Sequence, residues 1–172
     1  DPYIACFRRI AQVMRAVSSR FVTEWTMKKA TDRMAGRPIS DAWPGDEWVD
    51  LVGIDYYDGY PAYRDNAAWG RDFSARTDGG PRGLGAWLDF ARSHGKKLAV
   101  PEWGVRNRRG AGDDNALFVD RMVAFFQENA ADIAYEAYFN PYRGDAARVF
   151  SIYPDGNNPK AAERYLEAYR PR

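Results

Sequence analysis

The sequence predicts an α/β fold in which parallel strands alternate with helices. Short segments rich in apolar, β-branched and aromatic residues alternate with longer segments whose apolar residues recur every three or four positions. Helical connections between successive strands are typical of parallel sheets. The 172 residues are 45% hydrophobic and 28% charged, which suits a globular domain with a real core. We therefore assign residues 1–172 to one domain.

The first half of the chain begins with an amphipathic segment and then alternates strands with loops. Asp1 and Pro2 suit the cap and first turn of a helix. The elements predicted are a helix at 1–18, strands at 21–27 and 48–57, a turn at 43–46, and a loop rich in Gly, Asp and Arg at 59–81.

The second half continues the same alternation. Gly95 ends a helix whose apolar residues lie between 84 and 91, and Asp113 or Asp114 suits the N-cap of a later helix. The elements predicted are strands at 97–104 and 132–140, a loop at 104–114, and helices at 115–127 and 159–169.

Acidic and aromatic residues gather where all four predicted strands end. The groups are Glu24-Trp25, Asp55 to Asp58, Glu102-Trp103, and Tyr138 to Asn140. The C-terminal ends of parallel strands carry the functional residues in both open and closed sheets. A carboxylate can stabilise a cationic centre and an indole offers a flat apolar face, so the pattern favours chemistry on a sugar. A capping Glu with a packing Trp is the structural alternative.

Composition and missing motifs exclude several other classes of function. The 25 basic residues balance 24 acidic ones, which supports neither a nucleic-acid nor a membrane partner. The single cysteine excludes an intrachain disulfide, and the single histidine is poorly placed for a Ser-His-Asp triad. No apolar run is long enough to cross a bilayer. No phosphate-binding glycine motif is present, so nucleotide binding is not expected. Chemistry on a sugar by carboxyl groups needs no metal or organic cofactor, and none is expected. The start at Asp1, without Met or a signal-like segment, predicts the interior of a longer protein.

Four stretches resemble glycoside hydrolase family 26. Residues 44–57 (PGDEWVDLVGIDYY) and 95–104 (GKKLAVPEWG) carry the resemblance most specifically. Residues 112–115 (GDDN) and 134–140 (AYEAYFN) are similar to the loop and the eighth barrel strand that follow. The resemblance implies the second half, strands five to eight, of a TIM-type (β/α)8 barrel that acts on β-linked polysaccharides such as mannan with retention of configuration.

The resemblance also assigns roles to the residues at the strand ends. Glu102 matches the nucleophile, whereas the general acid/base would lie on strand four, upstream of Asp1. Glu24 and Glu136 are expected to be structural. Tyr56 or Tyr57 is expected to donate a hydrogen bond to Glu102, and only one of them can face the barrel mouth because neighbouring strand residues point to opposite faces. Asp55 and Asp58 are alternatives.

Several aromatic and amide side chains are expected to bind the sugar. The predicted stacking residues are Trp103, Trp43, Trp69 and Tyr60, and the predicted hydrogen-bonding residues are Tyr138 and Asn140. For Trp69 and Tyr60, burial under the long loop is the alternative role, and for Tyr56 and Tyr57 it is packing between the sheet and the helices.

Three interpretations of the whole chain remain open at this point. The first is a secreted retaining β-glycanase whose fragment, lacking one carboxyl group, is inactive alone. The second is a non-catalytic carbohydrate-binding relative, and the third is an unrelated open α/β domain. A half barrel has exposed strand edges, so self-association with a second copy is expected.

Overall fold

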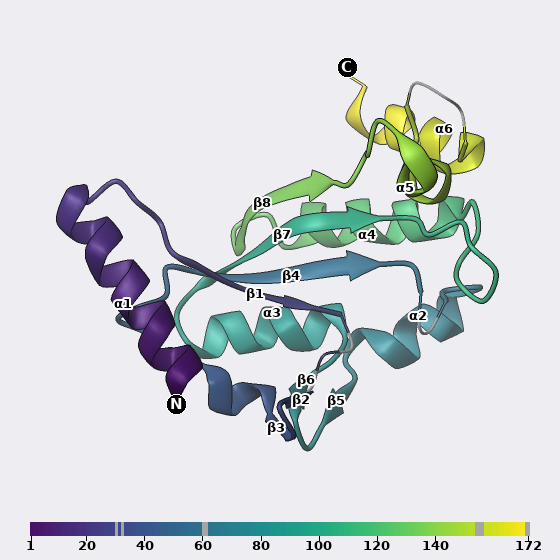
Figure 1. Ribbon diagram of the computed structural model, residues 1–172. Coiled ribbons are helices and arrows are strands. Elements are labelled where there is room, and N and C mark those ends of the chain that lie inside the picture. Colours follow the sequence, from purple (N-terminus) through teal and green to yellow (C-terminus); the bar gives the residue numbers. More distant parts are fainter. Residues whose placement is uncertain (30, 32, 60–61, 154–156, 171–172) are drawn as a thin grey trace.

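The computed structural model describes residues 1–29, 31, 33–59, 62–153 and 157–170. A parallel four-stranded sheet forms its centre, with strand order β1-β4-β7-β8 (Figure 1). The strands are β1 (Glu24–Lys28), β4 (Leu51–Tyr57), β7 (Lys97–Gly104) and β8 (Ile133–Tyr138). Each strand pairs with the next one along the chain, which confirms the predicted α/β order.

In the part of the chain that the structure describes, six α-helices surround the sheet, and two of them, α3 and α4, cover one of its faces (Figure 1). The helices are α1 (Pro2–Val17), α2 (Asn66–Phe73), α3 (Leu84–Ser93), α4 (Ala116–Glu128), α5 (Gly144–Phe150) and α6 (Pro159–Tyr169). In Figure 1, α3 and α4 run alongside the sheet, α6 lies next to α4, and α1 stands at the opposite end from α2. We call the face covered by α3 and α4 the outer face, and the opposite one the inner face.

The hydrophobic core lies between the outer face and these helices. Residues of alternate positions on the strands supply one side of it, namely Trp25, Val52, Ile54, Tyr56, Leu98, Val100 and Trp103. Trp87 of α3 and Phe118 and Met122 of α4 supply the other side, and all three are fully buried. Parallel strands with helical crossovers bury such a face by default.

The inner face is concave and has few large side chains near its centre. Gly53 and Ala99 are paired on neighbouring strands there. The Tyr135 hydroxyl of β8 donates a hydrogen bond of 2.6 Å to Glu24 of β1. These are the two edge strands, which would be about 14 Å apart in a flat sheet of four strands. A direct bond between their side chains therefore requires the sheet to curve, as part of a barrel wall does.

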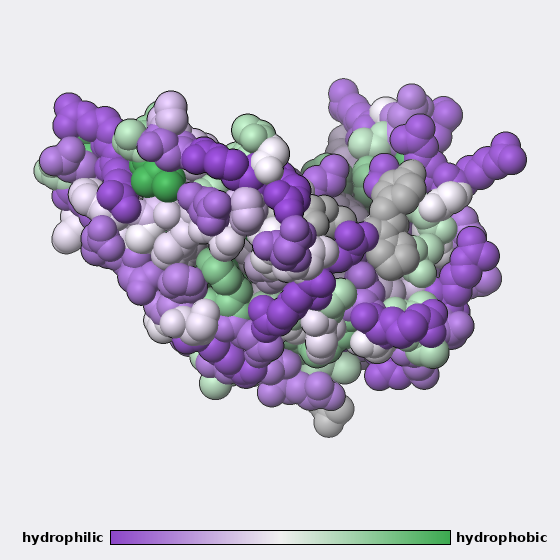
Figure 2. Space-filling view, turned by 90° about the horizontal axis from the view of Figure 1, so that it is seen from below, coloured by the Kyte–Doolittle hydropathy of each residue, from purple (hydrophilic) through white to green (hydrophobic). Residues whose placement is uncertain are grey.

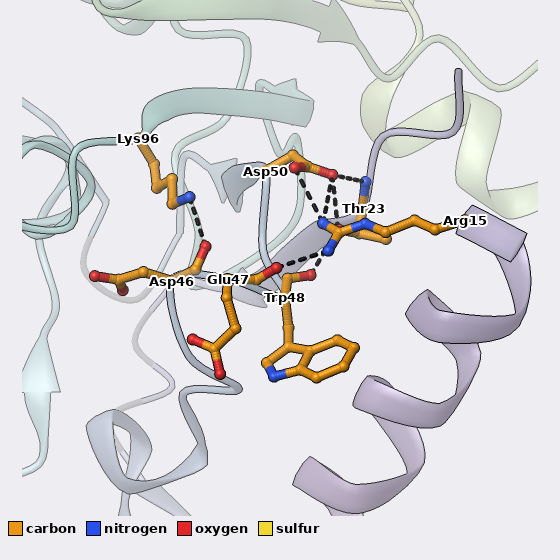
Figure 3. A network of polar contacts seen from close by, with 7 residues as sticks. All are labelled: Arg15, Thr23, Asp46, Glu47, Trp48, Asp50 and Lys96. Atoms are coloured by element: carbon orange, nitrogen blue, oxygen red, sulfur yellow. Dashed lines mark hydrogen bonds and ion pairs between the residues drawn. The ribbon is translucent and has the colours of Figure 1, made fainter. Parts of the chain in front are cut away.

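A polar network fixes α1 to the loop that precedes β4 (Figure 3). The Arg15 guanidinium donates to the Glu47 carbonyl oxygen at 2.6 Å and to both carboxylate oxygens of Asp50 at 3.1 Å. Asp50 also accepts from the backbone N–H of Thr23, just before β1. This network closes the N-terminal end of the sheet, opposite the end where functional residues are expected.

Three details differ from the sequence-based prediction. The predicted loop at 59–81 contains α2, which the Asp65 side chain caps by accepting from Ala68 N–H, and a short hairpin of β5 (Arg76–Thr77) and β6 (Gly80–Pro81). The first strand begins at Glu24 rather than at 21, since Phe21 and Val22 are exposed before the sheet. Helix α5 was not predicted, because its seven residues are too few to show a helical period.

Further short elements join β1 to β4. They are β2 (Arg33–Met34), β3 (Arg37–Pro38) and the 3-10 helix η1 (Ile39–Ala42). Figure 2 shows a mostly hydrophilic surface with small hydrophobic groups, one of them on the side where α1 lies. Within the described part of the chain, no helix has the length and apolar character needed to cross a membrane.

Candidate active site

A β-bulge in β7 turns Glu102 toward the inner face. Gly53 pairs with Ala99 and Tyr56 pairs with Trp103, so β7 contains one extra residue between these two pairs. The pairing of β7 with β8 shows the same extra residue, between Val100 and Trp103 of β7. In a regular strand Glu102 would point away from the face that Ala99 occupies. The extra residue reverses the alternation, and Pro101, which lacks an N–H, lies within the bulge.

Glu102 is held by a tyrosine from the neighbouring strand. The Tyr57 hydroxyl donates a hydrogen bond of 2.8 Å to Glu102 Oε2. Burial, together with the bond to the Glu102 carboxylate, raises the pKa of Tyr57 well above its usual range. Tyr57 therefore keeps its proton and acts as a permanent donor to Glu102.

Asp55 shares the inner face with this pair. Desolvation, followed by the negative charges of Glu102 and Glu24, raises the pKa of Asp55 to about 6, and Lys28 opposes this shift. A carboxyl group whose pKa is raised by burial and by neighbouring negative charges is frequent in active sites and also occurs in structural clusters.

A cavity of about 300 Å³ opens at this end of the sheet. Its lining residues are Lys28, Asp55, Tyr57, Glu102, Arg106, Phe139 and Phe150. Tyr57, Phe139 and Phe150 form an aromatic group, with ring centroids 5.1–5.9 Å apart. The cavity thus combines a tyrosine-bound carboxylate with an aromatic wall and two cations. Larger hollows lie elsewhere, such as a charged groove of about 740 Å³ between α4 and α6, but they do not include Glu102.

Of the two candidate tyrosines, the structure brings Tyr57 alone to Glu102. Tyr56 is fully buried on the outer face, where its ring stacks near Tyr63 and Phe118. The Tyr56 hydroxyl shares a hydrogen bond with that of Tyr63. The assignment of Tyr56 as a residue that acts on Glu102 is therefore wrong. Neighbouring residues of a strand point to opposite faces, and in β4 it is Tyr57 that points to the face of Glu102.

Trp103 does not form a sugar-binding surface. Its side chain is fully buried on the outer face, with its ring against those of Phe126 and Tyr138. Its indole N–H donates to Glu136, which also accepts from the Tyr169 hydroxyl of α6. The bulge that turns Glu102 inward also turns Trp103 outward, and the predicted stacking role is corrected to a core role.

Trp43 and Trp69 also lie away from Glu102. Trp43 packs against Trp25, Phe90 and His94. Its indole donates to Asp46 in the turn before β4, at the N-terminal end of the sheet. Trp69 on α2 contacts Tyr63 and Phe118 in the layer outside the sheet. Both predicted subsite roles are therefore corrected to packing roles.

Tyr138 and Asn140 hold the segment that follows β8. The Tyr138 hydroxyl donates to the Phe150 carbonyl oxygen at 3.0 Å. Asn140 accepts from Ile152 N–H at 2.8 Å and donates to the Tyr153 carbonyl oxygen at 2.7 Å. These bonds occupy the polar atoms that were predicted to bind sugar, so the two residues position Phe150 and its loop. Tyr60, the remaining predicted residue, lies outside the described residues.

The other acidic residues considered from the sequence have structural contacts. Glu24 accepts from Tyr135 and Thr26, at the closed end of the inner face. Asp58 is fully buried and accepts from Tyr63 N–H at 2.8 Å and from the Asn115 side chain at 2.6 Å. Burial raises the pKa of Asp58, and these donors oppose that shift.

Sequence reasoning missed four residues of the cavity. Lys28 ends β1, and Phe139 directly follows β8, so their strand-end positions were a usable signal. Phe150 comes from the unpredicted α5, and Arg106 from the loop after β7, so no periodic pattern pointed to either. Among the described residues, no group of His, Cys, Asp and Glu is arranged to hold a metal ion.

The parallel sheet, its covering helices and its curvature define part of a (β/α)8-type barrel, with Glu102 near the C-terminal ends of its strands. No protein-family model matches the chain. A mannan endo-1,4-β-mannosidase of Bifidobacterium adolescentis is 30% identical over 141 residues, covering 71% of this chain and 13% of that protein.

Two solved structures show the same architecture. A family 26 β-mannanase from Bacteroides ovatus superposes with a TM-score of 0.64 at 14% identity, covering 97% of this chain and 42% of that one. A modular family 26 endo-β-1,4-mannanase from Cellulomonas fimi gives 0.63 at 18% identity, covering 98% and 35%. The resemblance to family 26 and the partial barrel fold are confirmed, and the chain spans less than half of each of these relatives.

Proposed function

We propose that this chain carries the nucleophile of a retaining β-glycanase of the mannanase type. The observation that supports this most directly is the hydrogen bond from Tyr57 to Glu102 within an aromatic-walled cavity at the C-terminal ends of the strands. Within the described part of the chain, Tyr57 donates to one Glu102 oxygen, Oε2, and in the proposed reaction the other oxygen attacks.

In the proposed reaction, a Glu102 oxygen forms a bond to the anomeric carbon while the bond to the leaving sugar oxygen breaks. An acid protonates that oxygen, and water then releases the sugar from Glu102. Tyr57 positions the carboxylate, and Phe139 and Phe150 offer apolar faces to the sugar ring. Lys28 and Arg106 lie where they can bind hydroxyl groups.

We further propose that the acid/base residue lies outside these 172 residues. Retaining enzymes place their two carboxyl groups about 5–5.5 Å apart. Glu24, the other glutamate of the inner face, is bonded to Tyr135 on the side of Gly53 remote from the cavity. The isolated chain is therefore expected to hydrolyse a natural polysaccharide weakly or not at all.

The proposed substrate is a β-linked mannan or its oligosaccharides, on the strength of the similarity to mannanases. We place the protein outside the cell, because polymeric mannan does not cross membranes. Residues 1–172 would be one part of a single catalytic domain.

The first test uses activated 2-fluoro glycosides of mannose, glucose and xylose, whose leaving groups depart without protonation. After circular dichroism confirms folding, the chain is incubated with each compound and its peptides are analysed by mass spectrometry. We expect a sugar adduct on Glu102, strongest with mannose, and none in a folded Glu102→Gln variant. Glu47→Gln is the matched control and should keep the label, because Glu47 lies on the exposed turn before β4.

A folded chain that binds mannan oligosaccharides in calorimetry without labelling would favour the alternative of a carbohydrate-binding relative. A chain that neither binds nor labels would contradict both interpretations. The label also identifies the sugar.

The two edges of the sheet support a proposal about association. Exposed apolar residues flank both edges, namely Ile10, Val13 and Val17 on α1, Phe21 and Val22 before β1, and Leu166 and Tyr169 on α6. We propose that β8 of one copy meets β1 of a second copy when the chain is isolated, so that parallel pairing continues. Sedimentation should detect a dimer that Val17→Glu with Leu166→Glu dissociates, and a stable wild-type monomer would refute it.

A further inference from the structure

A buried lysine, Lys29, contacts the main chain of Tyr57, the residue that donates to Glu102. Lys29 follows β1, and its side chain is only 5% exposed. Burial of a lysine disfavours its charged form, and desolvation lowers the pKa of Lys29 to about 8, opposed by the charges of Asp72 and Asp58.

Lys29 contacts β4 at two points on either side of Tyr56. Its backbone N–H donates to the Asp55 carbonyl oxygen at 2.9 Å, and its ammonium donates to the Tyr57 carbonyl oxygen at 3.3 Å. Asp55 and Tyr57 are the two β4 residues that line the Glu102 cavity. One residue thus holds the main chain of both.

The rest of the environment fixes the ammonium from the helix side. Lys29 Nζ lies 3.7 Å from Asp72 Oδ2 of α2, 4.0 Å from the centroid of the Tyr63 ring and 4.9 Å from that of Tyr56. Asp72 also accepts from the hydroxyls of Tyr63 and Tyr56. Cation–π contacts and an ion pair of this kind stabilise a desolvated ammonium.

A simple counter-ion for Asp72 would need no contact with β4. The ammonium instead bridges the buried cluster on the outer face and the main chain that carries Tyr57. A shift of the Tyr57 main chain moves its hydroxyl relative to Glu102, because the ring connects the two rigidly. We therefore propose that Lys29 is a positioning residue that sets the hydrogen bond from Tyr57 to Glu102.

This inference deepens the proposed function, but its test does not depend on turnover. The readout is the side-chain carboxyl 13C NMR signal of Glu102, assigned with Glu102→Gln, in protein labelled at glutamate. Tyr57→Phe is expected to shift this signal. Lys29→Met, which keeps the length of the side chain and removes the charge, is expected to shift it in the same direction by less.

Double variants separate positioning from direct charge effects. In the Tyr57→Phe background, Lys29→Met should add no further shift, because the hydrogen bond it positions is gone. A direct charge effect would persist in that background and would overturn the proposal. Lys97→Met, at the exposed start of β7, is the matched control and should leave the signal unchanged.

The wild-type protein provides a test that does not require a buried variant to fold. Among the described residues, the titratable and charged groups that face the ammonium are Asp72, Asp58, Arg82, Tyr56 and Tyr63. As Lys29 loses its proton between about pH 7 and 9, the Glu102 signal should move, and Lys29→Arg should abolish that movement. A Glu102 signal that is constant over this range, or equal in Lys29→Met and the wild type, would refute the inference. If no glycoside labels Glu102, the proposed function fails while this result stands.

Discussion

The two faces of the sheet use the same residue types for opposite purposes. On the inner face, Asp55, Tyr57 and Glu102 are crowded, half-buried and open to a cavity. On the outer face, Asp58, Tyr56 and Trp103 are fully buried and bonded to protein partners. The adjacent residues Tyr56 and Tyr57 are divided between the two faces, and so are Glu102 and Trp103. The direction in which a side chain points therefore decides whether it can act on a ligand.

The largest effect should come from Trp103→Ala. Loss of a buried tryptophan on the outer face is expected to lower the free energy of unfolding by about 3–5 kcal/mol. The matched variant Glu102→Ala, one residue away on the inner face, should change it by less than about 1 kcal/mol. Urea unfolding of both would measure the difference, and similar losses in the two variants would mean that the faces are not distinct.

The next effect is expected from Asp58→Asn. The buried carboxylate of Asp58 accepts from Tyr63 N–H and from the Asn115 amide. In the variant, an NH2 group replaces one of the two accepting oxygens and therefore points at a donor. Removing one acceptor in a buried site should destabilise the protein by about 1–3 kcal/mol. A variant as stable as the wild type in urea would contradict the structural role of Asp58.

Asp55→Asn, three residues earlier, should have the opposite sign at neutral pH. Because the folded-state pKa of Asp55 is raised to about 6, the folded protein binds this proton more tightly than the unfolded chain, and stability falls as pH rises from about 4 to 6. Asn removes this penalty, which solvent screening limits to about 1 kcal/mol, or about 2–4 °C in Tm at pH 7.

The control for Asp55→Asn is about pH 3, where the wild-type carboxyl is largely protonated in both the folded and the unfolded state. There the variant and the wild type should melt together. A variant less stable than the wild type at pH 7 would show that Asp55 has a favourable partner on the inner face.

The smallest effect on stability should come from Tyr57→Phe. Its hydroxyl contributes one hydrogen bond at a site open to water, so a loss of at most about 1 kcal/mol is expected. The rate of labelling of Glu102 by an activated glycoside should nevertheless fall, by about 10- to 100-fold if the donor positions the nucleophile. An unchanged labelling rate would remove Tyr57 from the mechanism.

The strand–helix alternation and the location of Glu102 at a strand end could be predicted from the sequence. The period of apolar residues indicates elements, and parallel strands bring their C-terminal ends together. The orientation of Trp103 could not, because a single extra residue in β7 reverses the alternation. Pro101 indicates an irregularity in the strand, but a proline does not specify which residue is inserted. The residues of α5 and the loop after β7 reach the cavity through tertiary contacts, which short-range patterns do not encode.

The hydrogen bond between Tyr135 and Glu24 links the two edge strands, β8 and β1, across the concave face of the sheet. Burial and the Glu24 carboxylate raise the pKa of Tyr135 to about 12, so its hydroxyl keeps its proton under physiological conditions. Gly53 has no side chain, and a methyl group there would meet Thr26 and Glu24 within 2.5 Å. The curvature of the sheet is thus stabilised by contacts on its own inner face. The strands that complete the barrel would therefore pair with a sheet that is already curved.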